Sequence, residues 1–112
     1  MSLVAPEAPS DPCVVIEVAD APAASGGLAG RLAAAFAEAR DAGLGENGCV
    51  VFHAHGGEAL RAGLSGLARS LALEWGSRGI RVNVVVGEDA DDLIRFLASP
   101  ASRMLTGAVL DA

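Results

Sequence analysis

Short, nearly continuous apolar runs recur along the chain, each about as long as one β-strand. The first three read CVVIEV, CVVFH and IRVNVVV, and valine is the commonest residue in them. Apolar runs of this length without regular polar alternation are typical of strands covered on both faces. The pattern therefore predicts four strands, at residues 13–18, 49–53, 80–86 and 106–110.

The segments between these runs place apolar residues three and four positions apart, which is the spacing of an amphipathic helix. Because helices of this length cannot serve as hairpin loops, their alternation with strands indicates a parallel sheet with right-handed crossovers. We therefore expect a truncated, Rossmann-like α/β domain of about four parallel strands and three helices, in the order β-α-β-α-β-α-β. The helices are predicted at residues 28–42, 58–78 and 89–99, with Ser25 as the N-cap of the first.

The first residues are richer in proline than the rest of the chain and contain few large apolar side chains. Residues 1–11 are therefore predicted to form a flexible N-terminal arm, followed by a single Rossmann-like domain at 12–112. With 112 residues, the chain is long enough to bury one hydrophobic core.

Charge, apolar run length and cysteine usage narrow the classes of partner and location. The formal net charge is −6, which argues against nucleic acid and anionic membrane surfaces because both require a basic patch. No apolar run is long enough to span a bilayer. Cys13 and Cys49 each begin an apolar run and are interpreted as buried free thiols. Since two cysteines do not make a secreted disulfide framework, a cytoplasmic protein is predicted.

The predicted helix at 58–78 carries two different stripes of side chains. One stripe consists of leucines and Trp75, whereas the other contains only small residues. Glycine inside a helix costs about 1 kcal/mol relative to alanine, and close approach of another backbone would be a compensation. Two interpretations remain open, which are packing on the protein's own sheet and a helix contact between subunits. The small residues that form this candidate assembly surface are Ala59, Gly63, Gly66 and Ser70.

Two stretches resemble the C-terminal half of the short-chain dehydrogenase/reductase family. The first, at residues 61–86, reads RAGLSGLARSLALEWGSRGIRVNVVV and is similar to the family's active-site helix and sixth strand. The second, at residues 96–112, reads FLASPASRMLTGAVLDA and resembles the family's closing helix, loop and seventh strand. The resemblance implies that the sheet corresponds to the family's last four strands, in sequential order.

The family's catalytic and cofactor-binding residues are not matched. In the family a YxxxK motif leads into this helix, and its two named positions are occupied here by Gly57 and Arg61. Glycine has no proton to transfer, and the chain contains no tyrosine. The nearest string to the family's dinucleotide loop, SGGLAG at 25–30, lacks the required glycine spacing. No cofactor is therefore predicted, and NAD(P) follows only from analogy with the family.

Two histidines suggest a different chemistry. His53 and His55 lie on the same side of the predicted second strand, at the end where ligand sites of parallel sheets occur. With Glu58 nearby, a metal site or a histidine base can be imagined. Because two histidines and one carboxylate are a weak motif, we favour solvent-facing or hydrogen-bonded histidines and predict no metal site.

The sequence leads to two hypotheses of function. In the first, the chain is a degenerate, non-catalytic relative of the short-chain dehydrogenases/reductases. It would act by self-association, as a homodimer or larger assembly, or as the partner subunit of a full-length family member. In the second, it is an atypical oxidoreductase or small-molecule-binding enzyme that uses His55, Arg61 and Glu58 in place of the family's Ser-Tyr-Lys set.

Overall fold

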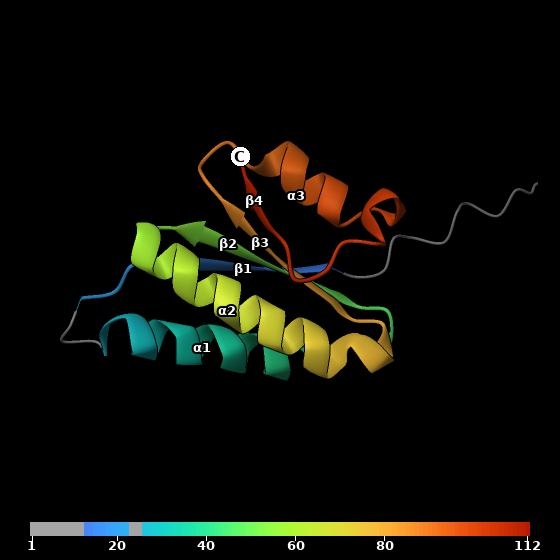
Figure 1. Cartoon of the computed structure of the whole chain (residues 1–112), viewed down its shortest axis with the longest axis horizontal. Helices are drawn as coiled ribbons and strands as arrows, with labels where there is room; N and C mark the ends of the chain where they lie inside the picture. Colours follow the sequence, from blue (N-terminus) through green and yellow to red (C-terminus); the bar gives the residue numbers. More distant parts are fainter. Residues whose placement is uncertain (1–12, 23–25) are drawn as a thin grey trace, which may run out of the picture.

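The computed structural model describes residues 13–22 and 26–112, in which the chain forms one four-stranded parallel sheet (Figure 1). The strands follow one another across the sheet in sequence order, with helices between them, so the predicted fold is confirmed. The predicted arm at 1–11 and the predicted N-cap Ser25 lie outside the described residues. The strands are β1 (Cys13–Ala19), β2 (Cys49–His55), β3 (Arg81–Val86) and β4 (Val109–Asp111), and the helices are α1 (Gly27–Asp41), α2 (Glu58–Trp75) and α3 (Asp91–Leu97).

The fourth strand begins later than the apolar pattern predicts. The segment before it contacts β3 through a side-chain hydrogen bond and a turn, and not through regular strand pairing. The Thr106 hydroxyl accepts a hydrogen bond from the backbone N–H of Val82 at 3.0 Å. Gly107 then donates its own N–H to the carbonyl of Val82 with a φ of 74°. This left-handed turn aligns the chain with β3 only from Val109 onward.

The long helix also ends differently from the prediction. α2 stops at Trp75 and continues as a short 3₁₀ turn, Gly76–Arg78, before Gly79 reverses the chain. Gly79 has a φ of 71°, which a residue with a side chain adopts only at a cost. The predicted glycine stop is therefore confirmed, with a tighter last turn than expected.

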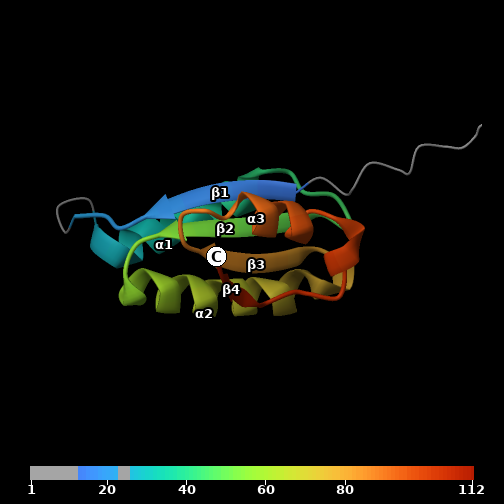
Figure 2. The same cartoon turned by 90° about the horizontal axis from the view of Figure 1, so that it is seen from above.

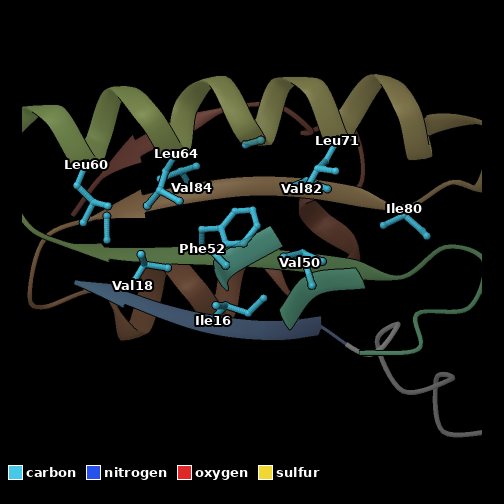
Figure 3. Packing of buried hydrophobic residues seen from close by; sticks show 14 residues of the cluster. Ile16, Val18, Val50, Phe52, Leu60, Leu64, Leu71, Ile80, Val82 and Val84 are labelled. Atoms are coloured by element: carbon cyan, nitrogen blue, oxygen red, sulfur yellow. The ribbon is translucent and has the colours of Figure 1, made fainter. Parts of the chain in front are cut away.

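The helices form one layer on each side of the sheet (Figures 1 and 2). α1 and α2 lie on one face, where they bury the largest apolar cluster of the molecule (Figure 3). α3 lies on the other face and contributes Leu97 to a second, smaller cluster with Val51 and Val85. The sheet is thus covered by two long helices on one side and by one short helix on the other.

Alternation along the strands decides which side chains reach each layer. In β2, Val50 and Phe52 point toward α1 and α2, whereas Cys49 and Val51 point toward α3. Because successive residues of a strand face opposite sides, His53 belongs to the α3 face together with Val51. The α3 face therefore changes from apolar to polar toward the carboxyl ends of its strands.

The small residues of α2 do not share one environment. A methyl group added at Gly63 would lie 2.8 Å from Cδ1 of Leu32, so this glycine allows α1 to pack closely on α2. Within residues 13–22 and 26–112, a methyl group added at Gly66 would meet no atom within 4 Å, and Ala59 and Ser70 are exposed. Close packing at Gly63 thus occurs within the chain, against α1, whereas the rest of the stripe faces outward.

The prediction that both cysteines are free thiols is wrong, because Cys13 and Cys49 form a disulfide. β1 and β2 pair in a register that places the two residues directly opposite each other, with their Cα atoms 4.3 Å apart. The strand pairing that creates this proximity joins residues 36 positions apart. Neither apolar run, taken alone, indicates that the two cysteines are paired. The thiol argument for a cytoplasmic protein is therefore lost. Among the described residues, none of the helices has the length and apolar character needed to cross a membrane.

Candidate functional site

Four polar side chains gather where β1, β2 and β3 end. Glu17 lies near the end of β1, directly opposite His53 of β2, and His55 follows two residues later on the same face. Glu88 comes from the loop after β3. Since parallel strands end at one edge of a sheet, this is the edge at which α/β proteins bind ligands.

His53 is held by two contacts and is nearly inaccessible, with 8% of its side chain exposed. Its Nε2 lies 2.7 Å from the carbonyl oxygen of Gly87, and its Nδ1 lies 2.9 Å from Oε1 of Glu17. A carbonyl oxygen only accepts, so Nε2 carries a proton and donates it to Gly87. The ring is therefore fixed with Nδ1 directed at the carboxylate.

His55 is more exposed than His53 and contacts a carboxylate with each ring nitrogen. Its Nε2 hydrogen-bonds the same Glu17 oxygen, and its Nδ1 lies 3.3 Å from Oε2 of Glu88. The hydrogen bond to Glu17 raises the pKa of His55 above its usual value, against the opposing effect of burial. The contact with Glu88 acts in the same direction as the one with Glu17.

Glu17 accepts from both histidines through one oxygen, although most of its side chain is exposed. Burial tends to raise its pKa, but hydrogen bonds from His55 and His53 outweigh that effect and lower the pKa below its usual value. One nitrogen of each histidine and one oxygen of Glu17 all lie within 4.8 Å of one another. These are donor types that bind transition metals in proteins.

The residues of the second functional hypothesis divide between two neighbourhoods, since Arg61 interacts with Glu58 and His55 contacts neither of them. His55 contacts Glu17 and Glu88, whereas Arg61 pairs with Asp111 at the end of β4. Glu58 is exposed in the first turn of α2. Among the residues that the structure describes, no hydrogen bond or ion pair joins His55 to Glu58 or Arg61.

Two members of the cluster, Glu17 and Glu88, were not identified from the sequence. A signal for Glu17 exists, because it is the single charged residue in the apolar run of β1 and shares a face with Cys13. The register that pairs Cys13 with Cys49 also pairs Glu17 with His53, so the two side chains lie next to each other on the same face of the sheet. Glu88 has no comparable signal, since its position depends on the path of a loop.

Comparison with known proteins gives a likeness in structure only. No family model matches the chain, and no curated protein matches it. Among solved structures, BdcA (YjgI) from E. coli superposes with a TM-score of 0.70 and 24% sequence identity, over 89% of this chain and 59% of BdcA. The landomycin C-6 ketoreductase LanV, solved with bound NADP and rabelomycin, gives a TM-score of 0.55 and 20% identity, over 72% of this chain and 46% of LanV.

Both matches extend over only part of the neighbours. This chain spans 59% of the length of BdcA and 46% of that of LanV. At these levels of identity the likeness concerns the arrangement of strands and helices. The chain thus shares a Rossmann-like α/β fold with these two structures.

Proposed function

We propose that this chain is a non-catalytic, short-chain dehydrogenase/reductase-like protein that acts by association with a second copy of itself. The observation that carries the proposal is the absence of a proton donor where the resemblance requires one. Gly57 occupies the position of the family's tyrosine, and the whole chain contains no tyrosine that could replace it. A methyl group added at Gly57 would meet no atom of the described part of the chain within 4 Å.

Arg61, at the position of the family's lysine, supports the same conclusion. Both terminal nitrogens of its guanidinium donate to the carboxylate of Asp111, and the second of these bonds measures 3.1 Å. The hydrogen bond that Arg61 donates to Asp111 raises the pKa of Arg61 further above an already high value. A guanidinium held in this way is a poor substitute for the lysine ammonium in proton transfer.

The outer surface of α2 supports association. We define the outer α2 stripe as Ala59, Gly66, Ser70 and Leu73, which recur at helical spacing. Leu73 is 86% exposed, and no atom of the described residues lies within 4 Å of a methyl group added at Gly66. A glycine in mid-helix without a neighbour costs about 1 kcal/mol, and a second helix approaching closely would compensate for it. A twofold pairing of this surface with itself would bury both copies of Leu73.

The edge of the sheet favours a second form of association, with a partner subunit. β1 lies at the end of the strand order, and Val15 on its α3 face is 38% exposed. An edge strand offers unpaired backbone groups to a strand from another chain. A full-length dehydrogenase subunit is the partner that the sequence resemblance suggests for this surface.

Light scattering of the purified chain at micromolar concentration tests the proposal. We expect a dimer or larger assembly that Leu73→Glu dissociates. Met104→Glu is the matched control, because Met104 is also a large apolar residue and is 88% exposed, but lies outside the outer α2 stripe. A monomeric wild type would overturn self-association. A dimer that survives Leu73→Glu but is lost in Val15→Glu would move the contact to β1.

A nucleotide titration tests the non-catalytic part separately. We expect neither NAD(H) nor NADP(H) to change the fluorescence of Trp75 in a saturable way, and no change in nicotinamide absorbance with carbonyl compounds. Saturable binding with turnover would favour the atypical enzyme instead. Loss of that turnover in His55→Gln, Glu58→Gln or Arg61→Gln would then assign the residues of the second hypothesis.

A further inference from the structure

The hydrogen-bond pattern at the carboxyl ends of β1 and β2 directs a ring nitrogen of His53 at a carboxylate oxygen of Glu17. His53 donates its Nε2 proton to the carbonyl of Gly87, so neutral His53 has a lone pair on Nδ1. That nitrogen lies 2.9 Å from Oε1 of Glu17, which is also an acceptor. Two acceptors at this distance need a cation between them, which is a proton when His53 donates to Glu17 and a metal ion when neutral His53 acts as a ligand.

His55 presents a second nitrogen to the same carboxylate oxygen. Its Nε2 contacts Oε1 of Glu17, while its Nδ1 faces Glu88 at 3.3 Å. If Nδ1 carries the ring proton and donates it to Glu88, Nε2 is free to coordinate a metal. Both histidines are thus oriented by a partner on the nitrogen that faces away from Glu17, as metal-ligating histidines are.

The surroundings of the cluster favour a cation. Four acidic residues from the loop after β3 and the start of α3 line a shallow hollow beside it. The chain as a whole carries a net charge of −6, so the local field and the overall charge have the same sign. The residues that line the hollow are Glu88, Asp89, Asp91 and Asp92.

We propose that Glu17, His53 and His55 form a site for one Zn²⁺ ion, bound through Nδ1 of His53, Nε2 of His55 and the carboxylate of Glu17. Two imidazoles and one carboxylate suit Zn²⁺ and disfavour Mg²⁺ and Ca²⁺, which take oxygen ligands. The cluster supplies three protein ligands, and Glu17 is largely exposed, so a fourth position can be filled from solvent. Gly87 and Glu88 act as positioning groups that hold the two rings.

Calorimetric titration of the untagged full chain with Zn²⁺ tests the site. The chain contains only these two histidines, and both of its cysteines are in the disulfide, so no thiol or other imidazole competes. We expect one equivalent to bind, and Glu17→Gln, His53→Gln and His55→Gln each to abolish that binding. Glu38→Gln is the matched control, since Glu38 is an exposed carboxylate on α1, on the opposite side of the sheet.

A separate variant, Glu88→Gln, tests the positioning role of Glu88. Glu88→Gln should retain the one-to-one stoichiometry and lower the affinity about 10- to 100-fold, as the loss of an outer-shell partner does. Circular dichroism of each variant establishes that it is folded before its titration is interpreted. Unchanged Zn²⁺ binding in folded Glu17→Gln, or equal loss of binding in Glu38→Gln, would overturn the proposal.

Nitrogen NMR of the two imidazoles gives a readout that unspecific Zn²⁺ binding would not produce. With Zn²⁺ we expect His53 to keep its proton on Nε2 and His55 to keep its proton on Nδ1, so that opposite ring nitrogens bear the metal. The same tautomer on both rings, or a proton on Nδ1 of His53 in saturating Zn²⁺, would contradict the geometry. These measurements do not depend on the oligomeric state, so a failed self-association test leaves the metal proposal intact.

Discussion

The two faces of the sheet differ in how completely helices cover them. α1 and α2 bury a continuous apolar cluster that includes Phe52, whereas α3 is seven residues long and covers a smaller one. The buried polar side chains on the strands, His53 and Asn83, both belong to the α3 face. The closely packed face stabilises the fold, while the partly covered face has room for polar groups with specific partners.

The largest expected effect belongs to the packed face. Phe52 is fully buried between the sheet and the helices, so Phe52→Ala should lower the free energy of unfolding by about 3–5 kcal/mol. The matched change on the other face is Val15→Ala, at a side chain that is 38% exposed, and should cost about 1 kcal/mol. Urea unfolding measures both. Equal losses would show that the two faces contribute alike to stability.

Asn83 provides the next largest effect, on the α3 face. Its side-chain amide donates to the carbonyl of Leu105 at 3.1 Å and accepts from the N–H of Ala108 at 3.0 Å. Asn83→Ala leaves both backbone groups unpaired and should cost about 1–3 kcal/mol. Hydrogen exchange at Ala108 should accelerate with it. The exposed substitution Ser77→Ala should change stability by about 0.5 kcal/mol at most. If Asn83→Ala costs no more than that control, the polar partners on this face do not stabilise it.

Alanine substitutions at the two glycines of α2 should change the stability less, and differently at the two positions. Gly66→Ala should raise the stability of the monomer by about 1 kcal/mol, because the added methyl group meets nothing. At Gly63 the methyl group would contact Leu32, so Gly63→Ala should gain less or destabilise. Unfolding at a concentration that dissociates any dimer measures this difference. Equal gains at the two positions would show that α1 does not press on α2 at Gly63.

The smallest expected effect is the pH dependence of the Arg61–Asp111 pair, which joins α2 to the end of β4. The hydrogen bond from Arg61 lowers the pKa of Asp111 below its ordinary value of 3.8. A depressed pKa stabilises the fold above the unfolded-state value, and this contribution is lost as the pH falls through the folded-state value. Asp111→Asn should therefore be slightly less stable than the wild type near neutral pH and equal to it in strong acid. A difference that persists in acid would assign the effect to packing.

The sequence by itself determined the order of elements, the parallel sheet and the glycine stop at Gly79. Valine-rich runs and helical spacing are local properties, and one chain segment at a time is enough to recognise them. The same local information placed His53 and His55 on one face of a strand. It also showed that Gly57 and Arg61 occupy the tyrosine and lysine positions of the YxxxK motif in the family that the chain resembles.

The tertiary structure alone decided which distant residues meet. Strand register made Cys13 and Cys49 a disulfide and placed Glu17 opposite His53. Loop and helix packing brought Glu88 to His55 and separated the environments of the small residues on α2. These contacts join residues tens of positions apart, and their geometry depends on how whole strands and helices dock. A pattern read along one segment contains no information about that docking, which is why the local structure was predictable and the polar cluster was not.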